Sequence, residues 1–257
     1  MKKFWDIVFN VINEAGLILE VIDSRMPEKT RNKFIENYTI RRHKKLIIVI
    51  NKCDLASKEE LEIIKAKFSK EFPCIFISAR EHLGTLILKR KIMQYATKLP
   101  VRVGVIGYPN TGKSSIINAL KGEHAAKTSP MAGFTKAKQW IRASKNILLI
   151  DSPGVIPYSS QKTETELVLS SSKTLQTIKD PEKVAVDILK SIFNKNKDII
   201  KEKYEVEPNK ISFKTLELIA IAKKKLRKHA VPDTELAARM IIQDYQKGKL
   251  MLKSKVI

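Results

Sequence analysis

One segment near the middle of the chain has the residue types and spacing needed to hold phosphate groups. Residues 107–114 read Gly-Tyr-Pro-Asn-Thr-Gly-Lys-Ser and fit the pattern G-x-x-x-x-G-K-[ST]. The glycines allow backbone N–H groups to wrap around an anion at a helix N-terminus. An apolar run at 101–106 precedes the segment and a helical pattern at 115–120 follows it, which is the context that such a loop requires. These observations favour a phosphate-binding P-loop over an ordinary glycine-rich turn.

The P-loop side chains have separate predicted tasks. Lys113 is expected to neutralise the β- and γ-phosphates and to stabilise transition-state charge, and the Ser114 hydroxyl is expected to bind Mg²⁺. The residues of this segment predicted to contact the nucleotide are Asn110, Thr111, Gly112, Lys113, Ser114 and Ser115.

A second polar segment predicts recognition of a guanine base. Asn51-Lys52-Cys53-Asp54 follows the apolar run 46–50, so its side chains would emerge at the carboxyl end of a strand. The Asp54 carboxylate can accept hydrogen bonds from guanine N1–H and from the 2-amino group, and Asn51 is expected to approach another edge of the base. A strand-ending turn could have the same spacing, but a P-loop in the same chain favours base recognition. The sequence therefore predicts GTP as the ligand rather than ATP.

Two short elements at other strand ends complete the predicted nucleotide site. Ser78-Ala79 resembles the element that backs the guanine base in GTP-binding proteins, with a plain strand end as the alternative. Asp151-Ser-Pro-Gly154 fits D-x-x-G, in which the carboxylate holds Mg²⁺ through water and the glycine N–H meets the γ-phosphate. An ordinary turn is the alternative there.

Thr135 and Val155 bear on the predicted hydrolysis. Thr135 lies between the P-loop and D-x-x-G, where it could give Mg²⁺ a second hydroxyl ligand, although a surface-loop threonine is the alternative. The predicted catalytic residues are thus Lys113, Thr135 and Gly154. Val155 stands where many GTPases have a glutamine that orients the attacking water. Because valine cannot orient water, slow intrinsic hydrolysis is expected, with activation by a partner or an ion.

Apolar runs with helical patterns between them predict an α/β fold. Six runs are expected to be strands, the last two forming an antiparallel hairpin in an otherwise mostly parallel sheet. They are 17–23, 46–51, 74–79, 101–106, 138–143 and 147–151. Helices are predicted at 58–69 and 86–95, and Phe4, Val8, Val11, Ile12 and Ala15 lie on one face of an expected N-terminal helix.

The residue pattern of the sequence changes after Gly154, from strand-like apolar runs to mostly helical periodicity. A polar stretch leads into segments with helical periodicity, including helices that are expected to begin near Asp180-Pro181 and at 232–235. We therefore predict a nucleotide-binding domain at 1–160 and a C-terminal helical domain at 161–257. No apolar run is long enough to predict a membrane span.

The charge balance predicts a polyanionic partner. The chain has 49 Lys and Arg against 27 Asp and Glu, a net charge of +22, which favours RNA through counterion release. Basic runs at 41–45, 89–91 and 223–228 are candidate contacts with phosphates, with solvated helix faces as the alternative. Aromatic residues are sparse near these runs in the sequence, which favours backbone and shape recognition over base stacking. The two cysteines, Cys53 and Cys74, lack a metal-type spacing, so a reducing cytoplasm is the expected compartment.

Together, these elements resemble the five motifs of the GTPase superfamily, but in the order fourth, fifth, first, second, third. The chain is similar to circularly permuted GTPases of the YlqF/RbgA type, which act in assembling the large ribosomal subunit. Asp23-Ser-Arg25-Met-Pro27 with Arg31-Asn32 resembles a further element of that family, and 236–250 resembles the family's C-terminal pattern. The resemblance implies a permuted Ras-like P-loop domain with a C-terminal helical domain, rRNA or a large-subunit precursor as partner, and Mg²⁺ as cofactor.

The resemblance also sets expectations about activation. Asn110 resembles the asparagine that helps to coordinate an activating K⁺, with a loop-stabilising role as the alternative. Family members often carry a Gly-His-Met element near the N-terminus, which residues 1–16 lack. His124 could substitute, although an exposed loop histidine is the alternative, and no protein general base is evident. An RNA-binding assembly scaffold with structural GTP and negligible turnover is therefore the competing prediction.

Overall fold

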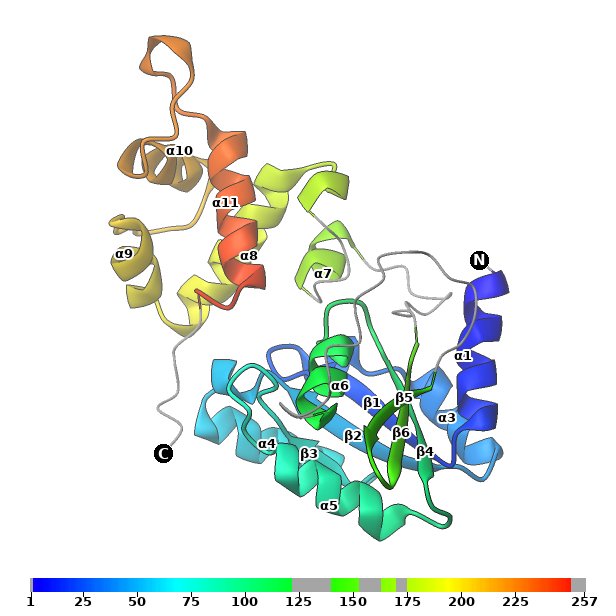
Figure 1. Cartoon of the computed structure of the whole chain (residues 1–257). Helices are drawn as coiled ribbons and strands as arrows, with labels where there is room; N and C mark the ends of the chain where they lie inside the picture. The colour runs from blue at the N-terminus through cyan, green and yellow to red at the C-terminus, as the bar shows by residue number, and fades with distance from the viewer. Residues whose placement is uncertain (1, 122–139, 153–162, 170–174, 251–257) are drawn as a thin grey trace. The chain divides into compact units, whose positions relative to one another are not determined.

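The computed structural model describes residues 2–121, 140–152, 163–169 and 175–250 (Figure 1). Contacts divide the chain into two compact units, one of residues 1–159 with 254–257 and one of residues 160–253. The predicted domain boundary at residue 160 falls within 153–162, outside the described residues, and it stays a prediction.

The first unit is built on a six-stranded sheet with the order β3-β2-β1-β4-β6-β5. All neighbouring strands are parallel except β5 and β6, which pair antiparallel. The predicted mostly parallel sheet with one hairpin is therefore confirmed. The strand bounds are β1 Leu17–Asp23, β2 Lys45–Asn51, β3 Cys74–Phe76, β4 Val101–Gly107, β5 Ile141–Ser144 and β6 Ile147–Asp151.

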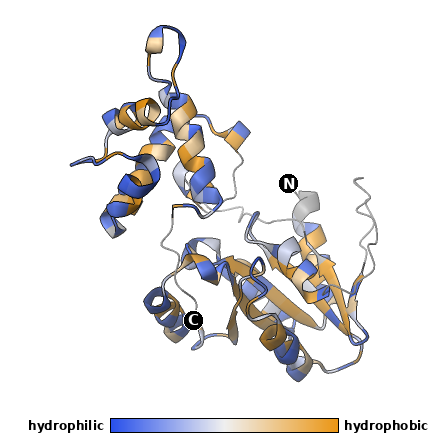
Figure 2. Cartoon of the chain, turned by 60° about the vertical axis from the view of Figure 1, so that its left-hand side comes forward, coloured by the Kyte–Doolittle hydropathy of each residue, from blue (hydrophilic) through white to orange (hydrophobic). Residues whose placement is uncertain are grey.

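Helices cover both faces of this sheet because successive side chains in a strand point to opposite faces. Leu17, Leu19 and Val21 of β1 share a core with α5 and α6. Ile18 packs with α1 and α3, and Ile22 packs with α4. Figure 2 shows the apolar strands between helices with polar outer surfaces. The helices of this unit are α1 Lys2–Glu14, α2 Pro27–Thr30, α3 Lys33–Arg41, η1 Cys53–Leu55, α4 Lys58–Phe68, α5 Thr85–Tyr95 and α6 Lys113–Lys121.

Two local signals fix where these helices lie. Among the described side chains of α1, Val8, Val11 and Ile12 are buried, with Ala15 just after the helix, as the predicted amphipathic face requires. Phe4, also predicted on that face, lies outside the described side chains. Ser57 and Glu60 form a capping box at the start of α4, so two backbone N–H groups at this end are satisfied.

β3 is shorter than predicted, since it ends at Phe76 rather than at Ala79. Its partner β2 ends at Asn51, and the chain then turns into η1. Ile77, the residue after the end of β3, still donates its N–H to Ile50 O, and its carbonyl accepts from Cys53 N. Ser78, in contrast, forms an antiparallel bridge with Leu83. The apolar run therefore continues beyond the point where the ladder stops.

The second unit is helical. Its central helix α8 packs against α7, α9, α10 and α11, and the buried side chains include Ile188, Leu216, Ile219, Ile241 and Ile242. The bounds are α7 Glu164–Leu169, η2 Leu175–Thr177, α8 Pro181–Lys195, α9 Asp198–Tyr204, α10 Phe213–Ala222, η3 Lys228–Ala230 and α11 Thr234–Gln246. Asp180 and Asp233 cap α8 and α11 as expected, because each carboxylate accepts from a backbone N–H in the first turn. In the described parts of the chain, no helix is long and apolar enough to cross a bilayer.

Candidate nucleotide-binding site

The carboxyl ends of the parallel strands bring the predicted motifs to one edge of the sheet. Asp23 at the end of β1 is in register with Asn51 at the end of β2. Gly107, which ends β4 and begins the P-loop, lies opposite Val21. Asp151 at the end of β6 lies opposite Val105. Residues far apart in the sequence therefore meet where open α/β sheets bind their ligands.

The P-loop has a backbone that only glycine permits at two points. Gly107 has φ +147°, and a Cβ there would lie 2.3 Å from Val21 O. Gly112 has φ +96°, and a Cβ there would lie 2.1 Å from Asn51 Nδ2. Glycine is thus required by both conformation and space. The residues present fit a phosphate group, because the loop leads directly into the N-terminus of α6.

Side chains of the P-loop also hold its own backbone. Lys113 Nζ donates to Tyr108 O at 2.8 Å, and Thr111 Oγ1 donates to the same oxygen at 3.0 Å. Helix α6 begins at Lys113, two residues earlier than predicted. Ser114 and Ser115 in its first turn are exposed, whereas Lys113 is buried along most of its length. The Lys113 ammonium therefore lies against the backbone of the loop whose bound phosphates it was predicted to neutralise.

Asn51 connects three of the predicted motifs. Its Nδ2 donates to Thr111 O in the P-loop at 2.8 Å. Its Oδ1 accepts from Ala79 N, in the predicted base-backing element, at 3.2 Å. Because Asn51 is only 2% exposed, these bonds are shielded from water. Asn51 was predicted to approach the base, and its hydrogen bonds to the P-loop and to Ala79 were not predicted.

Lys52 ties the base-recognition segment to the P-loop. Its backbone is left-handed, with φ +62°, and its Nζ donates to Asn110 O at 2.8 Å and to Asp23 Oδ2 at 2.7 Å. Burial lowers the pKa of Lys52, while the Asp23 charge opposes that shift. The predicted nucleotide-contacting residues Lys52 and Asn110 are thus brought together.

Asp23 is a site residue to which the sequence analysis gave no role beyond the family resemblance. Its carboxylate accepts two hydrogen bonds from the Arg25 guanidinium, at 2.9 and 2.7 Å, in addition to the bond from Lys52. Burial raises the pKa of Asp23, but the Arg25 charge and hydrogen bonds, followed by those of Lys52, outweigh it and lower this pKa to about 2. One signal in the sequence could have indicated that Asp23 binds Lys52. Its carboxylate ends a buried strand, and that strand lies beside the one that carries Asn51.

The remaining base-site candidates lie on the same edge. Asp54 is half-buried in η1, the short helix that begins directly after Lys52. Ser78 is fully buried, and its Oγ accepts from Glu81 N at 3.2 Å. The loop that carries Ala79 is therefore fixed both by Asn51 and by its own turn.

The predicted metal ligands are described only in part. Ser114 lies in the first turn of α6 and Asp151 ends β6, and hydroxyl and carboxylate oxygens are hard ligands of the kind that Mg²⁺ prefers. These residues fit the ion. Among the described residues, no cluster of three or more His, Cys, Asp or Glu could hold a metal by itself. Four residues named by the sequence analysis lie outside the described residues: His124, Thr135, Gly154 and Val155.

Comparison with known proteins identifies the family. The sequence profile described as RsgA GTPase matches residues 5–160. A profile described as 50S ribosome-binding GTPase matches residues 102–226, so it starts at the strand before the P-loop and leaves out segment 51–54. The crystal structure of YlqF from T. maritima, bound to GNP, is similar with a TM-score of 0.68 and 25% identity, and the match covers 98% of this chain and 97% of that one. The chain belongs to the circularly permuted GTPases of the YlqF type.

Curated relatives place this permuted GTPase among longer proteins. It is 41% identical over 95% of its length to an uncharacterized GTP-binding protein from Methanocaldococcus jannaschii, and it spans 65% of that relative. It is 34% identical over 97% of its length to nucleolar GTP-binding protein 2 from Saccharomyces cerevisiae, and it spans 52% of that relative. The chain therefore corresponds to between about two-fifths and two-thirds of the length of the curated relatives that it matches.

Proposed function

We propose that this permuted GTPase binds GTP with Mg²⁺, hydrolyses it slowly, and uses its nucleotide state to control association with a precursor of the large ribosomal subunit. The observation that carries the proposal is the position of Asn51, which hydrogen-bonds both the P-loop and Ala79. A single buried side chain thereby sets the spacing between the proposed phosphate site and the proposed base site.

The base site is proposed to select guanine through Asp54. An adenine in the same place would leave this carboxylate without its two donors, and an unmatched buried polar group costs about 1–3 kcal/mol or more when charged. Lys52, held between Asn110 O and Asp23, fixes the loop that carries Asp54. The proposed ligands are therefore GTP and GDP.

The proposed reaction is in-line attack of water on the γ-phosphate. Lys113 and the P-loop amides stabilise the charge that develops on the phosphate oxygens. Bound Mg²⁺ would supply further neutralisation of that charge, with Ser114 and Thr135 as its proposed ligands and Asp151 holding it through water. Val155 offers no group that orients water, so a partner, or K⁺ near Asn110, is proposed to raise the rate.

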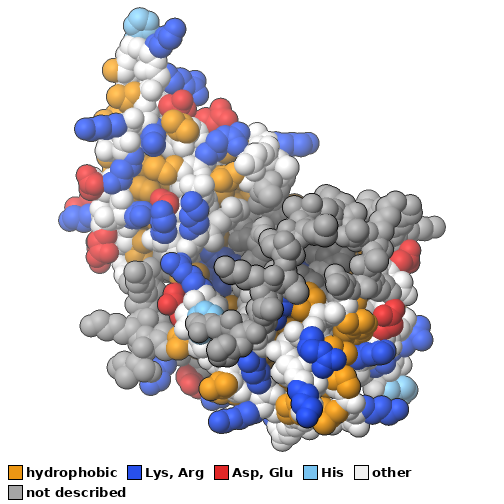
Figure 3. Space-filling model, in the orientation of Figure 1, with side chains coloured by type: hydrophobic (Ala, Val, Ile, Leu, Met, Phe, Trp, Pro, Cys, Tyr) orange, Lys and Arg blue, Asp and Glu red, His pale blue; other side chains and the backbone are white. Residues whose placement is uncertain are grey.

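The proposed partner is rRNA or a large-subunit precursor that contains it. The net charge of +22 suits a polyanion, and lysine and arginine side chains are spread over the visible face of both units (Figure 3). One matching family profile is described as a 50S ribosome-binding GTPase. The cytoplasmic location stays a prediction, since the yeast relative is named as nucleolar.

GTP turnover with Mg²⁺ tests this proposal, in Na⁺ or K⁺ and with or without large ribosomal subunits. We expect stimulation by subunits, and we expect Lys113→Ala to abolish it. Tight GTP binding without turnover in every condition would instead support the scaffold function, for which Val155 and the missing N-terminal histidine are the evidence. Absence of GTP binding would refute both functions.

A further inference from the structure

Helices α1 and α3 together carry a row of aromatic side chains on the outside of the first unit. Phe34 and Tyr38 are four residues apart on α3, and Trp5 and Phe9 are four residues apart on α1. The Trp5 and Phe34 ring centroids lie 5.3 Å apart, and those of Phe9 and Tyr38 lie 4.4 Å apart. The ring centroids of Trp5 and Phe9 lie 5.7 Å apart, and those of Phe9 and Phe34 lie 6.2 Å apart. We call these four residues the aromatic row.

The aromatic row packs α1 against α3, but one of its four rings remains largely exposed to solvent. Trp5, Phe9 and Tyr38 are each partly buried, whereas Phe34 is 57% exposed. Its ring is edge-on to Trp5, with an interplanar angle of 88°. A ring supported on one side and open on another offers a flat apolar surface to a ligand.

Positive charge continues the row along α3. Arg41 follows Phe34 by seven residues and therefore lies on the same helical stripe, and the Arg42 guanidinium lies 5.2 Å from the Tyr38 ring centroid. Residues 33–45 contain five Lys and Arg and a single acidic residue, Glu36. Glu36 is buried and paired with Arg31. No acidic side chain within this segment therefore offsets the charge at the surface.

The row ends beside a basic hollow. Asn13 joins the two, since its Oδ1 accepts from the Tyr38 hydroxyl at 3.4 Å and its carbonyl accepts from Lys44 Nζ at 2.9 Å. The hollow has a volume of about 530 Å³, and its charged lining residues are Lys44, Lys98, Arg102 and Glu14. Three cations against one carboxylate favour an anion there.

We infer that the aromatic row and the basic hollow bind one single-stranded RNA segment, with an unpaired base stacked on Phe34 and backbone phosphates near Arg41, Arg42 and the hollow. Exposed rings next to guanidinium groups are the combination that binds unpaired bases and their backbone. The inference rests on the proposed ribosomal function and names one surface that would serve it.

This inference differs from the expectation drawn from the sequence, which favoured backbone and shape recognition over base stacking. Near the basic run 41–45 the sequence has only the aromatic residues Phe34 and Tyr38, because Trp5 and Phe9 lie more than thirty residues before it. Folding places both beside Phe34 and Tyr38. We therefore infer that this surface binds RNA by base stacking as well as by contact with the phosphate backbone.

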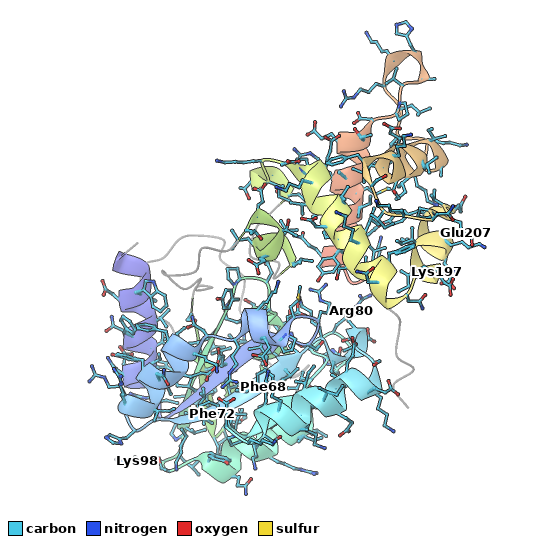
Figure 4. All side chains as sticks on the ribbon, turned by 180° about the vertical axis from the view of Figure 1, so that it is seen from behind. Phe68, Phe72, Arg80, Lys98, Lys197 and Glu207 are labelled. Carbon is cyan, nitrogen blue, oxygen red and sulfur yellow. The ribbon has the colours of Figure 1, made fainter. Side chains whose placement is uncertain are left out.

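The proposed RNA surface is separate from the nucleotide site. The hollow lies at the amino-terminal edge of the sheet, where β1 and β4 begin, whereas the P-loop follows the carboxyl end of β4. In Figure 4, Lys98 and Arg80 mark these two opposite edges. A substitution in the aromatic row is therefore expected to leave GDP affinity and intrinsic GTP turnover unchanged.

The test measures binding of the full chain, with GDP, to a fluorescently labelled single-stranded RNA of about 12 nucleotides, within the usual site sizes. Phe34→Leu keeps apolar volume but removes the ring, and Phe34→Tyr keeps the ring. We expect Phe34→Leu to weaken binding about 5- to 150-fold, the equivalent of one stacked base at about 1–3 kcal/mol. Phe34→Tyr should bind like the wild type. Leu86→Ala is the matched control, since Leu86 is 68% exposed on α5, away from the row.

A second readout reports stacking directly. The chain has two tryptophans, so Trp140→Phe leaves Trp5 as the only one. Addition of the RNA should quench the Trp5 emission, and Phe34→Leu should weaken the quenching in parallel with affinity.

The outcomes separate this inference from the proposed function. Failure of large subunits to stimulate wild-type turnover would count against the proposed function, whatever the RNA titration gives. Absence of RNA binding by the wild type, or equal RNA affinities of Phe34→Leu and Phe34→Tyr, would overturn the RNA surface. Loss of large-subunit binding by Phe34→Leu with unchanged RNA affinity would also overturn it, because the surface would then dock a protein.

Discussion

Asp23→Asn is the most informative single change at the candidate site. The substitution keeps the shape of the side chain but leaves the buried Arg25 guanidinium and the half-buried Lys52 ammonium without the carboxylate that holds each of them at 2.7 Å. Removing one member of a buried ion pair costs about 3–5 kcal/mol of folding stability. Lys52 would also lose one of the two contacts that position its Nζ against the P-loop.

The expected effect on the ligand follows from that lost contact. A hydrogen bond to a charged group contributes about 1.5–3 kcal/mol. If the contact is lost from the bound state, the GDP dissociation constant should rise about 10- to 150-fold. Titration with a fluorescent GDP analogue gives this constant, and urea unfolding gives the stability of the same variant.

A second buried ion pair provides the control. Glu36→Gln weakens the Arg31–Glu36 pair, which contacts none of the nucleotide motifs, so it should lower stability and leave GDP affinity unchanged. If Asp23→Asn binds the GDP analogue as tightly as the wild type does, the assigned role of Asp23 is refuted. If Glu36→Gln loses affinity equally, lowered stability explains both results and the role is refuted as well.

Three further predictions use the same structure. Gly112→Ala should abolish GDP binding, because its Cβ would lie 2.1 Å from Asn51 Nδ2, whereas Gly16→Ala, with its nearest atom 3.8 Å away, should bind normally in the same titration. Because the pKa of Asp23 is lowered from 3.8 to about 2, the wild type should lose about 2 kcal/mol of stability as pH falls from about 4 to about 2, and urea unfolding of Asp23→Asn should lack this component. Leu120→Ala, at a fully buried position of α6, should lower the free energy of unfolding by about 2–5 kcal/mol in urea titrations.

The sequence predicted the strands because each combines a buried apolar run with a clear end. It also predicted that Asn51 and Gly107 would reach the same edge, since the ends of parallel strands converge. It could not predict where β3 stops, because Ile77 continues the apolar run while the ladder partner has already turned away. Local pattern carries no information about how far a neighbouring strand extends.

Side-chain partners were the second kind of information that the sequence did not carry. Asp23 was noticed only through a family resemblance, yet the structure shows it bound to Lys52 and Arg25. The choice of partner depends on strand register, which places the ends of β1 and β2 side by side. Register is set by tertiary packing across the whole sheet, so motif spacing could not reveal it.

The central pairing of the sheet has a consequence for folding kinetics. β1 can pair with β2 across a short connection, but its other neighbour β4 follows about 80 residues later, with Leu17 opposite Val103. Closing so long a loop costs entropy before any contact repays it, and non-local strand pairs slow folding. The half that carries segment 51–54 can therefore organise first, while the phosphate loop arrives only with β4 and α6. Pairing of β1 with β4 is the step that brings the two loops together, so a complete nucleotide site requires this slow, non-local contact.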